Sequence, residues 1–178
     1  MRNKLSVLKE YFGHDSFREG QDRITDSLLG GRDVLGIMPT GAGKSICYQV
    51  PALMFDGITI VVSPLISLMK DQVSALVQSG VAAAYINSSL THAQYLKVLQ
   101  NTESGKYKII YVAPERLCAP AFLGICRNLN ISMVAVDEAH CVSQWGQDFR
   151  PSYLKIPDFI YALNSRPVVG LSLIHISE

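Results

Sequence analysis

Asp137 and Glu138 form a pair of adjacent carboxylates that directly follows an apolar run typical of a buried strand. Carboxylates at the end of such a strand are suited to binding Mg²⁺ and to activating a water molecule. The polar loop that follows carries the only tryptophan of the chain, Trp145, together with Phe149, Arg150 and Tyr153. Aromatic side chains interleaved with arginine are suited to base stacking and phosphate contact. The segment therefore predicts an ATP site beside a site for single-stranded nucleic acid.

A second chemical signal is the segment MPTGAGKS at 38–45, which lies between an apolar run and a helix-like segment. The strict phosphate-loop pattern requires glycine at the position of Met38, so the pattern fails there, while its core Thr-Gly-x-Gly-Lys is intact. The glycines of this core allow backbone N–H groups to converge on an anion, and the start of a helix adds its positive dipole. The residues expected to bind nucleotide here are Thr40, Gly41, Ala42, Gly43, Lys44 and Ser45.

The two signals assign complementary roles within one Mg-ATP site. Lys44 would reach the β- and γ-phosphates, and Ser45 and Asp137 would bind Mg²⁺. Glu138 would orient the attacking water, so the expected catalytic residues are Lys44, Asp137 and Glu138. Each signal alone has a plainer alternative, an incidental glycine-rich turn or a pair of solvated acids, and their occurrence together favours the ATP site.

Length and composition describe an ordinary globular protein. The 178 residues suffice for one buried domain, and a net charge of +1 implies that any nucleic-acid site is a local patch. The four cysteines form no CxxC pair and have no histidine at zinc-ligand spacing, so we expect small apolar residues in a reducing cytosol. The N-terminal apolar run is too short for a signal peptide, and no segment is long enough to span a membrane. These features predict a soluble, cytoplasmic protein.

Apolar runs rich in Val and Ile alternate with amphipathic segments along the chain, a pattern that predicts an α/β fold in which helices cover both faces of a mostly parallel sheet. The carboxyl ends of parallel strands share one edge, where ligands bind in such folds. No linker or internal repeat interrupts the pattern. The expected strands are 33–38, 58–63, 82–86, 108–112, 132–136 and 168–171, and the expected helices are 4–11, 21–29, 44–54, 65–79, 91–102, 120–128 and 153–163.

An ordered set of motifs resembles the RecQ family of DNA helicases. The most specific part is CVSQWGQDFR directly behind the DEAH box, because a DEAH box alone also occurs in RNA helicases. The match covers most of residues 5–172 and consists of FREGQ (17–21), MPTGAGKS (38–45), VVSPLISLMKDQV (61–73), YVAPERL (111–117) and DEAHCVSQWGQDFRPSY (137–153).

The resemblance implies a RecA-like P-loop NTPase domain, the first motor lobe of a 3′→5′ DNA helicase that uses ATP and Mg²⁺. It implies that Arg18 and Gln21 bind adenine, since a glutamine offers both a donor and an acceptor to the base edge. It also implies that His140 relays ATP state toward the partner lobe and that Gln144 takes part in coupling. The DNA-contacting residues implied by the resemblance are Ser63, Ser67, Lys70, Arg116, Trp145, Phe149 and Arg150.

Several of these residues have plainer structural roles that the sequence leaves open. Gln21 alone would be read as a surface helix residue. Ser63 before Pro64 could cap a helix, and Lys70 could lie on a solvated helix face. Trp145 and Phe149 could simply pin a long loop onto the core.

The C-terminal residues depart from the family pattern. After RPVVGLS the family continues with a segment resembling Thr-Ala-Thr-Ala, whereas residues 173–178 do not fit, so we expect one domain at 1–172 and a truncated or chimeric tail. The second motor lobe is an expected partner, together with single-stranded or duplex DNA. Without the arginine finger of that lobe, the fragment should bind Mg-ATP weakly, hydrolyse it barely and not unwind DNA.

Other function classes explain less of the sequence. A nucleotide- or nucleic-acid-binding module without turnover and a lobe of an RNA helicase both remain open alternatives. A P-loop kinase or transport ATPase would account for the phosphate loop and Asp137, but it gives no reason for the CVSQWGQDFR loop or for Gln21.

Overall fold

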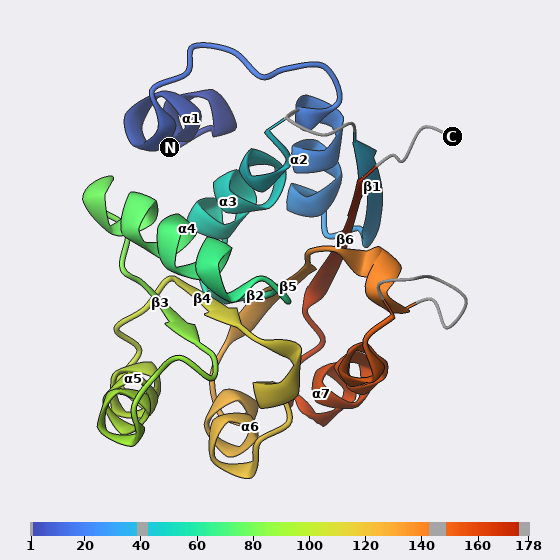
Figure 1. The fold of residues 1–178 in the computed structure, drawn as a ribbon. Coiled ribbons are helices and arrows are strands. Elements are labelled where there is room, and N and C mark those ends of the chain that lie inside the picture. Colours follow the sequence, from blue (N-terminus) through green and yellow to red (C-terminus); the bar gives the residue numbers. More distant parts are fainter. Residues whose placement is uncertain (1, 39–42, 143–148, 175–178) are drawn as a thin grey trace.

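A six-stranded parallel sheet forms the centre of the protein in a computed structural model that describes residues 2–38, 43–142 and 149–174. The strand order is β1-β6-β5-β2-β4-β3, and every pairing between neighbours is parallel (Figure 1). The strands are β1 (Val34–Met38), β2 (Ile58–Val62), β3 (Ala83–Ile86), β4 (Ile109–Val112), β5 (Ile131–Val136) and β6 (Val168–Ile174).

Helices cover both faces of this sheet, and two separate hydrophobic clusters mark the two faces. One face packs against α2 (Gln21–Leu29), α3 (Lys44–Met54) and α4 (Ile66–Gln78), and α1 (Lys4–Phe12) packs on α3. The opposite face packs against α5 (His92–Glu103), α6 (Pro120–Arg127) and α7 (Ile156–Ala162). Three short 3₁₀ segments complete the described elements: η1 (Pro114–Arg116), η2 (Ala139–Val142) and η3 (Pro151–Lys155).

The direction of each crossover explains this division of the helices. The connections through α3 and α4 move along the sheet toward β3, whereas those through α5, α6 and α7 move back toward β1. Parallel crossovers are right-handed, so opposite directions place their helices on opposite faces. All five residues of β2 are buried, as expected for a central strand covered on both sides.

Local signals in the sequence set the start of two helices. The side chain of Asn3 accepts a hydrogen bond from the backbone N–H of Ser6 at 2.8 Å, and Thr91 accepts one from Gln94 at 3.2 Å. Each forms a capping box, which satisfies backbone donors that the first helical turn leaves without partners. Among the described residues, no helix is both long and apolar enough to cross a membrane.

The predicted α/β alternation is confirmed, with two differences at the C-terminal side. The single helix predicted for 153–163 is wrong in its first part, where η3 precedes a shorter α7. Pro157 has no backbone N–H to donate to residue 153, so a continuous α-helix from that point would lack a hydrogen bond. Strand β6 is longer than predicted and runs to Ile174, which pairs with Met38 of β1.

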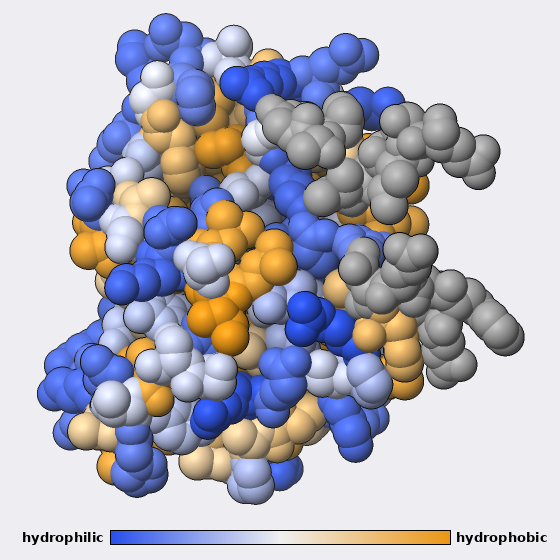
Figure 2. Space-filling model, in the orientation of Figure 1, coloured by the Kyte–Doolittle hydropathy of each residue, from blue (hydrophilic) through white to orange (hydrophobic). Residues whose placement is uncertain are grey.

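The surface is largely hydrophilic in the view of Figure 2, with an apolar patch near its centre. This patch lies where α4 begins in Figure 1. Leu65, Ile66 and Leu68 are the exposed large apolar residues of that segment. The start of α4 therefore presents apolar side chains at the edge of the sheet where the strands end.

Candidate functional site

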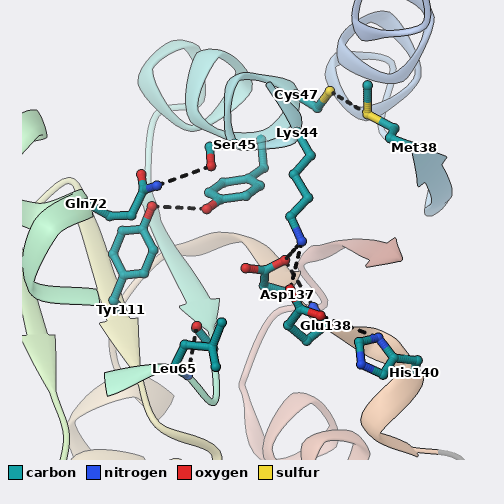
Figure 3. A network of polar contacts seen from close by, with 12 residues as sticks. Met38, Lys44, Ser45, Cys47, Leu65, Gln72, Tyr111, Asp137, Glu138 and His140 are labelled. Atoms are coloured by element: carbon teal, nitrogen blue, oxygen red, sulfur yellow. Dashed lines mark hydrogen bonds and ion pairs between the residues drawn. The ribbon is translucent and has the colours of Figure 1, made fainter. Parts of the chain in front are cut away.

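The side-chain amine of Lys44 lies between two carboxylates (Figure 3). Its Nζ is 2.9 Å from Asp137 Oδ1 and 2.9 Å from Glu138 Oε1. Lys44 is the first residue of α3, and the carboxylates directly follow β5, so the contact joins segments 94 positions apart in the sequence. The structure thus brings together the three residues that the sequence predicts to be catalytic.

This cluster combines one cationic side chain with two acidic ones. Burial opposes the charge on Lys44, but the hydrogen bonds and charges of Asp137 and Glu138 outweigh it, so the pKa of Lys44 lies above its ordinary value. One ammonium therefore faces two carboxylates that are each less than a tenth exposed. Such an excess of buried negative charge favours a further cation beside Asp137.

The residues present fit Mg²⁺ held jointly by protein and nucleotide. No cluster of three or more Asp, Glu, His or Cys side chains suitable for a metal occurs in the described part of the chain. Mg²⁺ usually takes one or two carboxylates, with waters and substrate phosphates completing its ligands. Asp137 and the hydroxyl of Ser45, in the first turn of α3, are ligands of this kind.

A tight turn after β5 positions the two carboxylates. Glu138 has a φ of 54°, a left-handed conformation that is uncommon for residues other than glycine. Its backbone N–H donates to Asp137 Oδ1 at 3.0 Å, and the Tyr153 hydroxyl donates to the backbone oxygen of Asp137 at 2.8 Å. On the other side, His140 Nδ1 lies 3.4 Å from Glu138 Oε2. The turn is held by contacts to both of its residues.

The start of α3 meets the FREGQ segment through Gln21. Gln21 Nε2 donates to the backbone oxygen of Gly43 at 3.0 Å, and its Oε1 accepts from the backbone N–H of Arg18 at 2.8 Å. Gly43 has a φ of 68°, where other residues are strained, and a Cβ there would lie 2.7 Å from Gln21 Nε2 and displace that amide. A hollow beside this contact is lined by His14, Ser16, Arg18, Gln21, Gly43 and Ile46.

The predicted nucleic-acid residues differ in their surroundings. Ser63 is buried and its Oγ accepts from the backbone N–H of Leu65 at 3.4 Å. Leu65 is the N-cap residue of α4 and that helix has no side-chain cap, so the predicted alternative that Ser63 caps a helix is wrong. Ser67 is exposed in the first turn of α4, and Lys70 is exposed on the same helix. Phe149 is half-buried.

Two arginines meet at a hollow near the start of α4. The guanidinium of Arg116 lies 5.7 Å from the centre of the Tyr95 ring, and Arg150 is exposed with its backbone N–H donating to Cys141 at 2.9 Å. The hollow places two cationic side chains and the carboxylate of Glu115 beside apolar ones. Its lining residues are Pro64, Ile66, Ser88, Ala113, Glu115, Arg116 and Arg150.

Some predicted residues lie outside the described residues, and some contacts were not predicted. Gln72 has no site role in the sequence prediction, yet it contacts Ser45. Tyr153, predicted among the exposed aromatics suited to base stacking, is instead buried and contacts Asp137. Gln72 could have been noticed because helical spacing places it on the same face as the buried Met69 and Leu76. The predicted residues outside the described ones are Thr40, Gly41, Ala42, Gln144 and Trp145.

Comparison with known sequences gives consistent matches. A family model described as DEAD/DEAH box helicase matches residues 18–172. The ATP-dependent DNA helicase RecQ of Bacillus subtilis is 51% identical over 165 residues, which make up 92% of this chain and 28% of that protein. The RecQ protein of Pasteurella multocida is 47% identical over 168 residues, covering 94% of this chain and 27% of that protein. The chain therefore spans little more than a quarter of the length of these relatives.

Comparison with solved structures supports the fold. A hypothetical ATP-dependent RNA helicase from Sulfolobus tokodaii matches with a TM-score of 0.75 and 20% identity, covering 100% of this chain and 52% of that one. The DUF1998 helicase MrfA bound to DNA matches with a TM-score of 0.77 and 17% identity, covering 99% of this chain and 27% of that one. The predicted RecA-like fold is confirmed.

Proposed function

Because the chain belongs to the DEAD/DEAH box helicase family, we propose that it is the nucleotide-binding motor lobe of a RecQ-like DNA helicase. The resemblance to RecQ proteins is confirmed by the matches at 51% and 47% identity. The proposal covers residues 1–172 as the lobe, Mg-ATP as its cofactor and single-stranded DNA as its nucleic-acid ligand. Because DNA is processed there, we expect the protein to be located in the bacterial cytosol or nucleoid.

Lys44 carries the proposal for the nucleotide site, because its ammonium lies 2.9 Å from both carboxylates at the edge where parallel strands end. When ATP binds, its phosphates compete with these carboxylates for the ammonium of Lys44. Asp137 is then free to hold Mg²⁺ together with the Ser45 hydroxyl, and Glu138 is free to orient a water molecule. Bound Mg²⁺ would neutralise charge that develops on the phosphates.

The base of ATP would bind beside Gln21. The hollow next to Gly43 is lined by Arg18 and Gln21, and both residues belong to the segment that resembles an adenine-binding motif. Gln21 already contacts Gly43 at the start of α3, so adenine and phosphates would be held by neighbouring parts of one site. Thr40, Gly41 and Ala42 would complete the phosphate-binding loop.

Single-stranded DNA would bind along the start of α4. Arg116 and Arg150 line one hollow with apolar Ile66, a combination suited to a phosphate next to a base. Ser67 is exposed close by and could donate to a phosphate, and Lys70 adds charge on the same helix. Phe149, with Trp145 and Arg150, would sense DNA and pass its occupancy to Glu138, while His140 would relay ATP state toward the second lobe and Gln144 would take part in the coupling.

The isolated chain should be a weak catalyst. In related phosphoryl-transfer sites an arginine finger accounts for about 10³–10⁵ in turnover, and in helicases of this type a second lobe supplies it. Unwinding also requires two lobes that close and open around ATP. We therefore expect weak Mg-ATP binding, very slow hydrolysis and no strand separation by this polypeptide alone.

The test is titration of the purified chain with a fluorescent ATP analogue, with and without Mg²⁺, and with single-stranded oligonucleotides. We expect Mg-dependent binding that Lys44→Ala abolishes, and binding of an oligo-dT strand that Arg150→Ala weakens. The exposed Lys97→Ala on α5 is the matched control for the lysine. Equal binding of an RNA strand would favour an RNA helicase lobe, and Mg-independent nucleotide binding would contradict the proposed site.

A further inference from the structure

Gln72 of α4 reaches across to the residue that we expect to bind Mg²⁺. Its Nε2 donates to Ser45 Oγ at 3.5 Å, a contact between the middle of α4 and the first turn of α3 (Figure 3). We propose that Gln72 is a positioning residue, which holds the Ser45 hydroxyl for Mg²⁺ and links it to the helix that begins at the DNA-facing edge. The inference rests on the proposed Mg-ATP site.

The orientation of the Gln72 amide is set by a second glutamine. Gln49 Nε2 donates to Gln72 Oε1 at 3.0 Å, so the oxygen of Gln72 faces Gln49 and its NH₂ group faces Ser45. Gln49 is only 4% exposed, and exchanging the two ends of the Gln72 amide would bring two NH₂ groups together. With Gln49 donating to Gln72, the NH₂ group of Gln72 acts toward Ser45 as a donor.

Gln49 is itself anchored in the core. Its Nε2 also donates to the Tyr111 hydroxyl at 3.0 Å, and the hydroxyls of Tyr111 and Tyr48 are 3.1 Å apart. Burial raises the pKa of Tyr111 to about 12, so both its proton and its acceptor capacity are kept at neutral pH. The series of hydrogen bonds from Tyr111 on β4 through Gln49 to Gln72 therefore consists of neutral groups, and it is fixed at Tyr111.

The hydrogen-bonding capacity of a serine hydroxyl fits this arrangement. The oxygen has two lone pairs and one proton. With one lone pair occupied by Gln72 and the proton directed to the hydroxyl of Tyr48, with which Ser45 also hydrogen-bonds, one lone pair remains for Mg²⁺. Groups that orient a metal ligand in this way typically affect metal affinity by about 10–100-fold when they are removed.

The position of Gln72 on α4 gives the contact a second consequence. The same helix carries Ile66 at the hollow with Arg116 and Arg150, and exposed Ser67 in its first turn. A shift of α4 on binding DNA would move Gln72 relative to Ser45, because a helix moves as a rigid element. DNA and Mg-nucleotide would then influence each other through α4, independently of the loop behind the DEAH box.

The experiment measures the Kd of a non-hydrolysable ATP analogue for the whole chain, in Mg²⁺ and in EDTA, with Gln72→Met as the test variant. We expect Gln72→Met to raise the Kd in Mg²⁺ about tenfold and to leave the Kd in EDTA unchanged. Gln78→Met is the matched control, because Gln78 lies exposed on the same helix. A loss of binding that is equal in Mg²⁺ and EDTA would mean a purely structural role and would overturn the inference.

A double-variant cycle with Ser45→Ala identifies the route. If Gln72 acts through Ser45, Gln72→Met should have no further effect on the Kd in the Ser45→Ala background. An undiminished effect there would overturn the inference. In wild type, oligo-dT should change the Kd of the Mg-nucleotide, and this change should shrink in Gln72→Met.

The outcomes separate this inference from the proposed function. If the wild-type chain binds no nucleotide in a Mg-dependent way, the proposed function and the inference both fall. If wild type shows Mg-dependent binding while Gln72→Met and Gln78→Met behave alike, the inference alone falls.

Discussion

The ammonium of Lys44 lies 2.9 Å from Oε1 of Glu138, whose backbone adopts a left-handed conformation at φ 54°. The pairing joins the start of the phosphate-binding helix to the residue expected to orient water. An uncommon backbone conformation costs free energy and is retained when surrounding contacts determine it. Here the contacts are Lys44 on one side and His140 on the other. Nucleotide binding would have to replace the first of these.

Replacing Lys44 by Ala should affect both binding and stability. Nucleotide affinity should be lost, because the phosphates lose their cationic partner. The free energy of unfolding should fall by about 1–3 kcal/mol, since two buried carboxylates would keep their charge without that partner. Urea denaturation measures the second effect, with Lys97→Ala as control. An unchanged unfolding midpoint would contradict the buried pairing.

Glu138→Gln and Asp137→Asn should change nucleotide affinity in opposite directions. Glu138→Gln frees Lys44 from one competing anion, so Mg-nucleotide should bind up to about fivefold more tightly, the equivalent of about 1 kcal/mol. Asp137→Asn removes an expected Mg²⁺ ligand and should weaken binding. Isothermal calorimetry distinguishes the two, with exposed Glu115→Gln as control. Weaker binding in Glu138→Gln would show that Glu138 itself contributes to the bound state.

The hydrophobic pattern was sufficient to predict the arrangement of strands and helices. The central Val- and Ile-rich runs became parallel strands that are buried on both faces, as the fully buried β2 illustrates, whereas edge strand β1 leaves Leu35 and Ile37 exposed. The pattern failed at residue 153, where apolar periodicity predicted a helix but Pro157 removes a necessary donor. Periodicity reports which face is buried, and it does not report backbone hydrogen bonds.

The site was predictable only where a motif carried the chemistry. MPTGAGKS and DEAH indicated Lys44, Ser45, Asp137 and Glu138, and a parallel sheet brings such segments to one edge. The contact of Gln72 with Ser45 was not predictable, because it depends on how two helices from different crossovers pack on one face. For Ser63 the sequence left DNA contact and helix capping open, whereas the structure shows a buried side chain that bonds to Leu65 without capping α4.

Tyr153 should contribute to stability through one hydrogen bond. Its hydroxyl, on a residue that is 1% exposed, donates to the backbone oxygen of Asp137 at 2.8 Å. Tyr153→Phe leaves that buried oxygen without this donor and should lower the free energy of unfolding by about 1–2 kcal/mol. Tyr161→Phe is the control, because Tyr161 is 85% exposed and should show no change. Equal unfolding midpoints in the two variants would contradict this role.

Arg150 should contribute to DNA binding mainly through charge. Arg150→Ala should weaken oligo-dT binding. It should also reduce the slope of log Kd against log salt by about one, the value for the loss of one phosphate contact. Arg127→Ala, exposed at the end of α6, removes the same charge away from the hollow and should leave the slope unchanged. Fluorescence anisotropy over a salt series measures both. Identical slopes for the two variants would place the DNA elsewhere.

Asp33 should make stability depend on pH in the acid range. Its Oδ1 accepts from the backbone N–H of Val169 at 2.9 Å and its Oδ2 from Arg166 at 2.6 Å, which ties the start of β1 to β6. The hydrogen bond from Val169 lowers the pKa of Asp33 below its ordinary 3.8; burial opposes this shift, and Arg166 adds to it.

A carboxyl whose pKa is lowered in the folded state stabilises that state above its unfolded pKa, and this stabilisation is lost as pH falls through the folded pKa. Asp33→Asn keeps an acceptor for Val169 but removes the charge, so it should cost about 0.5 kcal/mol at neutral pH, a small value because the side chain is 42% exposed. The difference between the two proteins should shrink as pH falls below 3.8. Urea denaturation across a pH series measures it, and a difference that stays constant into the acid range would show that the charge of Asp33 does not contribute.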